Sequence, residues 1–507
     1  MKAGFPRKTF SSTFASIAVF GAVLAFLLLA GTLFPRDAKS PPEHLTNVRP
    51  AQTYLDADGF HIFAAATNRI TNPQLADKDG NGIADGWSAV TNGNYDASFQ
   101  IQAPSNGAPG EQIIRLTGIK APTDEDWLGL SWKENGTKTK WALGAEVKID
   151  WMPGTTDQEK NALPDFSVMA TVDGKPANIT LQKTDIGTGW RRIFINGLDL
   201  PAGRDFHAQL RCQSNAQNWQ SAAGGIEIRF RKPQLENSVS SQGVAFSTPA
   251  VLPTDPGVTV NDKGEAHRDV GFVQIATAGD LRKSPFRLDT SKDWCFFVQW
   301  KPALDASEIL LNDFFDWQIL NIDDHWDSPA PVHNEIHLDI SSGSLFPKGN
   351  RIAVFLWNYY PGNGTSLNQP AAADWILDSV DLTPYIRMGD VCRAVYWKTK
   401  GHHYVKMNVY RNGSLILSRM ASQDLTVCND SGILKKMTLG SEHKETGYAS
   451  TLNSNSIFQF VSVEYSTINE NIADAFLTTG ARPQNPNTVA RWDFSQGNDQ
   501  VYVRPSK

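Results

Sequence analysis

Several features that identify common catalytic and nucleic-acid-binding classes are missing from this sequence. The net charge is only −6 over 507 residues and there is no basic stripe, so nucleic acid is not an expected partner. The patterns GxSxG and GxxxxGK[ST] are absent, which excludes the common nucleophile elbow and phosphate-binding loop. No window has the length and period of a long amphipathic helix. The fold must therefore be built mainly from strands.

Cysteine is also scarce. The chain has four, Cys212, Cys295, Cys392 and Cys428, and none has the CxxC spacing of a zinc or redox site. Cys392 and Cys428 fall in the same predicted domain, so a disulfide between them is one alternative. The other alternative, which we favour, is that all four are buried thiols.

The N-terminal region contains one long apolar run without charge. Residues 9–35 have no charged side chain, and their core of about 21 residues, at ~1.5 Å per residue, is long enough for a ~30 Å hydrocarbon layer. Lys2, Arg7 and Lys8 precede it, which keeps the N-terminus cytoplasmic. We predict a cytoplasmic N-terminus (residues 1–11) and a single-pass signal anchor (residues 12–34). A cleaved signal peptide is the alternative, and either one exports the rest to the periplasm or the cell exterior.

The remaining sequence divides into short segments. Residues 35–60 are polar and contain several prolines, which predicts a linker. After them come short alternating runs such as "ASFQIQA" and "YVKMNVYRNGSLIL", separated by Gly, Asn, Asp and Pro, which are typical of antiparallel sandwiches. A Ser-, Pro- and Gly-rich stretch at residues 237–257 predicts a boundary. We therefore expect an all-β protein with two antiparallel sandwich (jelly-roll) domains, residues 61–240 and 241–480, and a C-terminal tail, residues 481–507.

One loop has the spacing of a calcium site. In "DKDGNGIAD" the acidic and amide residues alternate, and Gly82 occupies the turn position. The twelfth position is Ser88 where a helix-flanked calcium loop has glutamate, so the helical form is not expected. A turn rich in Asp and Asn is the alternative, because Asp-Gly and Asn-Gly favour turns by themselves. We predict a structural Ca²⁺ whose ligands are Asp77, Asp79, Asn81, Ile83 (through its carbonyl) and Asp85.

Three segments in the first predicted domain resemble a known family. They are "NPQLADKDGNGIADGW", "GTGWRRIFINGLDLPAG" and "IRFRKPQLE", and together they are similar to carbohydrate-binding modules with a galactose-binding-like jelly roll, over about residues 66–239. That resemblance implies a domain that can bind sugar, although many domains of this fold serve as spacers. Sugar rings stack on flat aromatic faces. The candidate platforms are Trp127, Trp132 and Trp190, and for each of them a place in the core is the alternative.

The second predicted domain resembles a different sandwich family. "WCFFVQWKP", the hairpin "YVKMNVYRNGSLILS", "KKMTLGSE" and "FQFVSVEYSTINENIADAF" are similar in order to concanavalin A-like (laminin G-like) lectins and glucanases. The Asn412-Gly413 pair suits the tight turn of that hairpin. The resemblance implies a lectin-like or glucanase-like sandwich over residues 241–480.

One strand of this domain carries a candidate catalytic set. In "HNEIHLDIS" we expect Ile336, Leu338 and Ile340 to face the core, which leaves Glu335, His337 and Asp339 on the opposite face. Alternate carboxylates suit a retaining glycosidase, and a histidine suits the base of a polysaccharide lyase. The ExDxxE pattern of the glucanases is absent, so their mechanism does not transfer directly. A solvated strand with mixed polar residues is the alternative.

Three functions remain open from the sequence. We favour a membrane-anchored, extracytoplasmic, lectin-like protein that holds a cell-surface or exported polysaccharide without catalysis. A polysaccharide hydrolase or lyase with a catalytic second domain is one alternative. A structural or adhesive surface protein that contacts other proteins is the other.

Overall fold

The chain was analysed as a computed structural model that describes most of the residues beyond His44. The described residues are 45–48, 54–308, 314–323, 333–343, 346–359, 372–377, 381–424, 433–440, 455–494 and 501–503, except for gaps at 64, 92, 104–109, 121–122, 124–125, 137–139, 176–179, 216, 238–247, 270–272, 278–283 and 484. The chain separates into two compact units, Met1–Glu43 and His44–Lys507. The first unit lies outside the described residues, so all that follows concerns the second.

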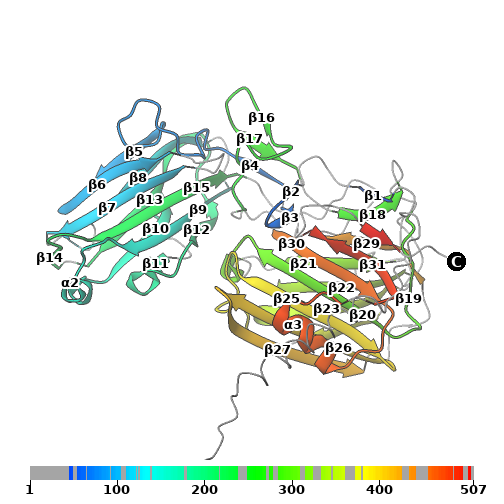
Figure 1. The fold of residues 1–507 in the computed structure, drawn as a ribbon. Coiled ribbons are helices and arrows are strands. Elements are labelled where there is room, and N and C mark those ends of the chain that lie inside the picture. Colours follow the sequence, from blue (N-terminus) through cyan, green and yellow to red (C-terminus); the bar gives the residue numbers. More distant parts are fainter. Residues whose placement is uncertain are drawn as a thin grey trace, which may run out of the picture. The chain divides into compact units, whose positions relative to one another are not determined.

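Two antiparallel sheets form the first sandwich (Figure 1). The strands of sheet I, in spatial order, are β11 (Thr180–Gln182), β10 (Phe166–Val172), β13 (Arg204–Ser214), β8 (Trp127–Gly136) and β5 (Trp87–Thr91). The strands of sheet II are β12 (Arg191–Asp199), β9 (Lys140–Trp151), β15 (Ile226–Glu236), β7 (Glu111–Ile119) and β14 (Trp219–Gln220), with β6 (Tyr95–Gln102) also paired to β7. A capped helix, α2 (Asp157–Ala162), follows β9.

Apolar residues at alternate positions of these strands fill the space between the two sheets. On β8, Leu128, Leu130 and Trp132 belong to the buried cluster, while the residues between them point to the other face. Trp141 on β9 is fully buried and packs edge-to-face against Phe206 of β13, with ring centroids 4.7 Å apart. Each strand therefore contributes one face to the core and presents the other outward.

The second sandwich also consists of two antiparallel sheets. The strands of sheet III are β1 (Leu45–Val48), β18 (Val273–Thr277), β29 (Lys436–Leu439), β21 (Phe314–Asp323), β22 (His333–Gly343), β23 (Phe346–Tyr359) and β24 (Ala372–Leu377). The strands of sheet IV are β2 (Tyr54–Asp56), β3 (Gly59–Ile62), β30 (Ser456–Glu464), β20 (Trp294–Pro302), β25 (Val391–Thr399), β26 (His402–Arg411) and β27 (Ser414–Asp424), with β31 (Thr488–Asp493) and β32 (Val501–Val503) at one side.

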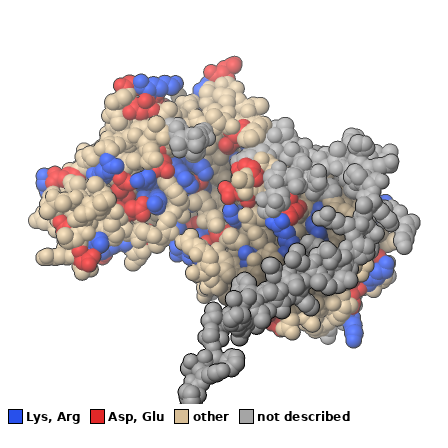
Figure 2. Space-filling model, in the orientation of Figure 1, with Lys and Arg blue, Asp and Glu red and all other residues tan. Residues whose placement is uncertain are grey.

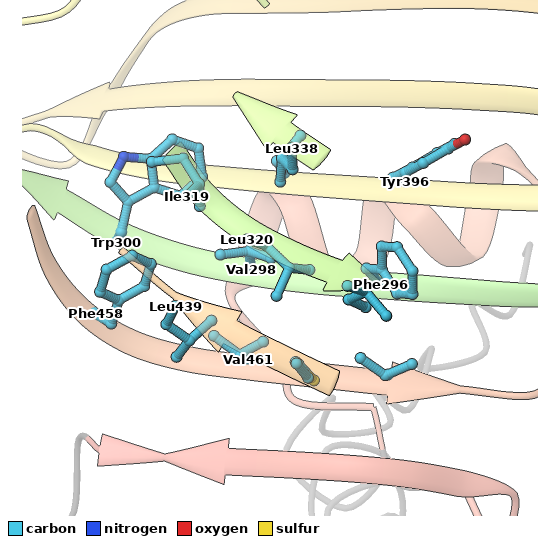
Figure 3. Close-up of a cluster of buried hydrophobic side chains, with 14 of the residues drawn as sticks. Phe296, Val298, Trp300, Ile319, Leu320, Leu338, Tyr396, Leu439, Phe458 and Val461 are labelled. Atoms are coloured by element: carbon cyan, nitrogen blue, oxygen red, sulfur yellow. The ribbon is translucent and has the colours of Figure 1, made fainter. Parts of the chain in front are cut away.

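Side chains from both of these sheets meet in one core (Figure 3). Phe296, Val298 and Trp300 alternate along β20 and face Leu320 of β21 and Leu338 of β22. The opposite face of sheet IV is covered by helix α3 (Glu470–Thr479), which Asn469 caps and Gly480 ends in a left-handed conformation. The part of sheet IV under α3 is thus buried on both faces, whereas no helix among the described elements covers the outer face of sheet III.

Three short pairs of strands complete the described structure. They are β4 (Ala66–Asn68) with β17 (Ala266–Arg268), β17 with β16 (Thr259–Val260), and β19 (Leu288–Asp289) with β28 (Ile433–Leu434). Two 3₁₀ turns, η1 (Lys183–Asp185) and η2 (Ala306–Glu308), lie between strands. All strand pairs described are antiparallel, which confirms the predicted all-β class at that level.

The segment predicted as a linker contains strands. Within residues 35–60, β1 pairs with β18 and β3 pairs with β30, so both belong to sheets of the second sandwich. Phe60 and Ile62 are buried in its core. These two strands are only four residues long, and their partners lie more than 200 positions away, so local composition could not reveal them.

The cysteines and the membrane prediction have different outcomes. Cys212, Cys295 and Cys392 are free, buried thiols, and burial raises the pKa of Cys212 to about 12, so these three agree with the buried-thiol alternative. Cys428 lies outside the described residues. In the part of the chain that the structure describes, no helix has the length and apolar character needed to cross a bilayer. The anchor predicted at residues 12–34 also lies outside that part.

Two buried carboxyl groups stand near the end of the first sandwich. Glu236 is fully buried, and the backbone N–H and hydroxyl of Thr248 donate to its Oε1 over 2.6 and 2.8 Å. Burial raises the pKa of Glu236 to about 7. Burial likewise raises the pKa of Glu308 to about 7, although the Nε–H of Arg192 lies 3.0 and 2.9 Å from its two carboxylate oxygens and acts in the opposite direction.

These raised pKa values predict a loss of stability with rising pH. The folded chain holds the Glu236 proton more tightly than the unfolded chain, whose pKa is 4.5, so the stabilisation is complete below 4.5 and is lost as the pH rises through about 7. We expect Glu236→Gln, which cannot ionise, to flatten the pH dependence of the free energy of unfolding between about 5 and 8. The variant should remove up to about 3 kcal/mol of that dependence. Calorimetric profiles of variant and wild type that stay parallel would contradict this assignment.

Candidate functional site

The loop between β4 and β5 brings three carboxylates together. Oxygen atoms of Asp77, Asp79 and Asp85 all lie within 4.8 Å of one another. Asp77 also accepts the backbone N–H groups of Gly80 and Gly82 over 2.8 and 2.7 Å, which closes the loop. The acidic triad can hold a metal ion, as the sequence predicted.

The other two predicted ligands have defined positions in the same loop. The Asn81 side-chain amide donates to Asp79 Oδ2 over 2.9 Å, and its Oδ1 accepts the Ile83 N–H over 2.8 Å. The Asp85 carboxylate accepts the Lys78 N–H over 3.1 Å. The triad supplies only hard oxygen donors, and its spacing of at most 4.8 Å allows a cation bound at roughly 2.3–2.6 Å from each oxygen, as Ca²⁺ prefers.

Two amide side chains that were not among the predicted site residues hold this loop in place. Asn72 donates to the carbonyls of Ala76 and Asp85 over 2.8 and 3.0 Å and accepts the Ala76 N–H over 2.9 Å. Gln112 on β7 is fully buried and donates to Gly82 O over 2.8 Å while accepting the Ala84 N–H over 3.0 Å. The carboxylates are therefore positioned from both ends of the loop.

The outer face of sheet I carries mostly uncharged polar side chains. We call this surface the polar face of sheet I. Its cross-strand rows are Ser167–Gln213–Trp127, Met169–Arg211–Gly129, Thr171–Gln209–Ser131 and His207–Lys133. The hydroxyl of Ser131 lies 3.1 Å from Nδ1 of His207, and the Thr171 hydroxyl donates to Gln209 Oε1 over 3.4 Å.

One cation lies in the middle of this face. The guanidinium of Arg211 lies 3.7 Å from the centroid of the Trp127 ring, and its Nε–H donates to Gln209 Oε1 over 3.0 Å, with a second bond from Nη2. Arg211 pairs across the strands with Gly129, which has no side chain to block it from folding over Trp127. Burial lowers the pKa of Arg211.

The outer face of sheet II is different, because its charges are paired with one another. Arg115 and Arg229 both contact Glu227, and Arg231 donates to Glu146 over 2.7 Å. Burial raises the pKa of Glu146, but Lys232 and Arg231 outweigh it and lower that pKa to about 2. In Figure 2, basic and acidic side chains are likewise interspersed on the visible side, without a large field of one sign.

The three predicted sugar platforms occupy three different places. Trp127 lies on the polar face of sheet I, where Arg211 covers one side of its ring. Trp190 precedes β12, and Arg231 lies over its ring at 3.8 Å. Trp132 belongs to the core cluster and packs against Trp87 with ring centroids 5.7 Å apart. The structure does not bring the three together, and sugar binding at each stays a prediction.

The predicted catalytic strand exists as β22. Ile336, Leu338 and Ile340 are buried in the core between sheets III and IV, as the alternation predicted. Glu335, His337 and Asp339 occupy the alternate positions, and their side chains lie outside the described residues. Their catalytic role stays a prediction.

The hydrogen bonds from Gln112 to the metal loop give a test of how the site is positioned. Gln112→Leu removes the bonds to Gly82 and Ala84 and leaves buried backbone groups without partners, so we expect it to destabilise the first sandwich by about 2–4 kcal/mol. Gln102→Leu, on the neighbouring strand β6 and exposed, is the matched control and should change stability by less than about 0.5 kcal/mol. Equal melting temperatures for the two variants would contradict the positioning role.

Comparison with known proteins gives only distant likenesses. No family model and no curated protein matches the sequence. Among solved structures, the enzymatically active domain of tailspike protein 2 from bacteriophage CBA120 is 9% identical, with a TM-score of 0.30, covering 45% of this chain and 28% of that one. The full-length tailspike protein 2 is 12% identical, with a TM-score of 0.27 over 45% of this chain and 27% of that one. Domains LG4-5 of the mouse laminin alpha1 chain are 8% identical, with a TM-score of 0.19 over 85% and 92%. This chain thus spans less than a third of the length of the two tailspike chains. Likenesses this distant do not assign a function.

Proposed function

We propose that this chain is a membrane-anchored, extracytoplasmic carbohydrate-binding protein that holds a polysaccharide on the polar face of sheet I. The observation that supports it most is the contrast between the two outer faces of the first sandwich. The outer side of sheet I carries amides, hydroxyls, an imidazole and an indole, of which Ser167, Gln213 and His207 are at least partly exposed, whereas sheet II presents paired charges. Export by residues 12–34 would place this face in the periplasm or outside the cell.

The chemistry of the polar face suits sugar recognition. Sugar hydroxyls are both donors and acceptors, and the partly or fully exposed side chains Ser167, Gln213 and His207 can match either role. A planar group beside them offers the apolar face that a pyranose ring needs. On this face the planar group is the stack of Arg211 on Trp127. In the same proposal the first sandwich is a galactose-binding-like jelly roll and the second a concanavalin A-like sandwich.

A polysaccharide hydrolase or lyase is the second candidate. The observation in its favour is that β22 presents Ile336, Leu338 and Ile340 to the core, so that Glu335, His337 and Asp339 share the alternate positions of one strand. Helix α3 packs on part of sheet IV, and β22 lies in sheet III, whose outer face no helix among the described elements covers. In this reading the first sandwich would hold the polymer that the second cleaves.

For the metal loop we propose a structural Ca²⁺. Asp77, Asp79 and Asp85 would supply carboxylate oxygens, with Asn81 and the Ile83 carbonyl as further ligands. The ion would offset the repulsion among the three carboxylates and fix the entry to β5. Its role would be structural, because the loop folds back on itself through backbone N–H groups that donate to Asp77.

The proposed binding face gives a direct test. We expect the full chain to bind at least one polysaccharide on a glycan array, and His207→Ala to weaken that binding about five- to tenfold, because it removes an exposed hydrogen-bonding ring. Lys148→Ala, on the outer face of sheet II, is the matched control and should bind like wild type. No binding to any glycan would favour a structural role, and release of new sugar chain ends by the wild type would favour the enzyme.

The proposed calcium site is tested by stability. A ligand that binds only the folded chain raises its melting temperature by mass action, so Ca²⁺ should raise it and a chelator should lower it. Asp79→Ala should abolish the shift, whereas Asp262→Ala, in an exposed turn, should keep it. If Ca²⁺ leaves the melting temperature of the wild type unchanged, the calcium proposal fails and the loop is an ordinary turn.

A further inference from the structure

Arg211 differs from every other arginine of the first sandwich. Between Ala66 and Glu236 the chain has eight arginines, and seven of them form ion pairs with a carboxylate: Arg69, Arg115, Arg191, Arg192, Arg204, Arg229 and Arg231. Arg211 has no carboxylate within ion-pair distance among the described residues, and its contacts are Gln209 and Trp127. A half-buried cation without a counter-charge is costly, because part of its hydration is lost and neutral contacts replace only part of it.

The neighbouring acids do not neutralise it. The acidic residue on β13 is Asp205, and it is paired with Lys133. The acidic residue that follows β10 is Asp173, and it is paired with Arg204 and accepts the backbone N–H of His207. The rows that contain Trp127, Gly129 and Ser131 have no acidic side chain. The lowered pKa of Arg211 has desolvation as its cause, which agrees with a guanidinium that no acid stabilises.

The guanidinium is nevertheless held in one orientation. Gln209 accepts from its Nε and Nη2, and the ring of Trp127 supports its plane. A guanidinium has five N–H donors, so about three remain for a ligand after these two bonds. A fixed planar fork of this kind matches two oxygens of one oxyanion.

A second arginine–tryptophan stack in the same sandwich shows what a purely structural version looks like. Arg231 lies 3.8 Å from the Trp190 ring centroid, nearly the same distance as in the Arg211 stack. Arg231 is neutralised by Glu146, whose Oε2 is 2.7 Å from its Nε. In the Arg211 stack the neutral Gln209 Oε1 takes the place of that acid at Nε, so the charge of Arg211 is not neutralised and its remaining N–H donors are open to a ligand.

We infer that the polar face of sheet I binds an anionic polysaccharide, and that Arg211 forms a bidentate contact with a carboxylate or sulfate of one sugar unit. Gln209 and Trp127 position the guanidinium, and the exposed or partly exposed His207, Gln213 and Ser167 lie in other rows of the same face to meet hydroxyls of that unit or its neighbours. This inference rests on the proposed glycan binding and specifies the charge of the glycan. It also explains how a chain of net charge −6 would attract an acidic polymer, through one local cation and not through its overall field.

The inference is tested with three soluble polymers: polygalacturonate, a sulfated glycan such as dextran sulfate, and neutral dextran. We expect the full chain to bind a charged polymer more tightly than the neutral one, and Arg211→Gln to lose about tenfold or more in affinity for it. Binding should weaken with added salt in the wild type and much less in the variant. Arg211→Lys keeps the charge but not the fork, so it should recover only part of the affinity.

Arg231→Gln is the matched control, because it removes the other stacked arginine and should leave affinity unchanged. Preference for polygalacturonate identifies a carboxylate as the partner, and preference for dextran sulfate identifies a sulfate. Equal affinity for charged and neutral polymers, unchanged in a folded Arg211→Gln, would overturn the anionic inference and leave the proposed glycan binding standing. If none of the three polymers binds and the glycan array is also negative, the proposed function itself fails.

Discussion

The two-residue period of the β-strand controls what this molecule can do. Every long strand described in the first sandwich has one face in a core, so only outer faces and loops remain for binding. On sheet II the outer face is occupied by ion pairs that satisfy one another. On sheet I it is occupied by neutral polar groups around one unpaired cation. The difference between the two faces is the physical basis of the functional account.

The same constraint separates the roles of the two sandwiches. The part of sheet IV that lies between the core and helix α3 is buried on both faces. Sheet III keeps an outer face, and β22 places three polar residues at its alternate positions. The first sandwich has no covering helix over sheet I among the elements described, and its loop before β5 collects carboxylates at one end. The proposed binding face and the proposed metal site therefore lie where the core does not use the side chains.

Much of the architecture could be predicted from the sequence, because alternation is a local signal. The strand "HNEIHLDIS" shows this, since its three isoleucine and leucine positions are in the core as its pattern indicated. The acidic loop was found by the spacing of Asp77, Asp79 and Asp85. The strands β1 and β3 were missed because so few residues, paired with partners far along the chain, carry almost no local pattern.

The contacts between residues far apart in the chain could also not be predicted from the sequence. Gln112 lies 30 positions after Gly82, whose carbonyl it binds, and nothing in its neighbourhood indicates that role. Arg211 stands in "QLRCQS", where an arginine has no special meaning. Its significance comes from the register of β8, β10 and β13, which places Trp127 and Gln209 beside it and no acidic residue in the rows of Trp127, Gly129 and Ser131. The absence of a partner becomes visible only when all neighbours are in place.

Hydroxyl-radical footprinting of the full chain, with and without polygalacturonate, tests directly whether an acidic polymer binds on the polar face of sheet I. It reports the solvent exposure of individual side chains, and Met169, His207 and Trp190 are reactive residues that are all at least partly exposed. Binding on the polar face of sheet I predicts that Met169 and His207 become protected while Trp190, beside sheet II, does not change. Protection of Trp190 with Met169 and His207 unchanged would contradict it.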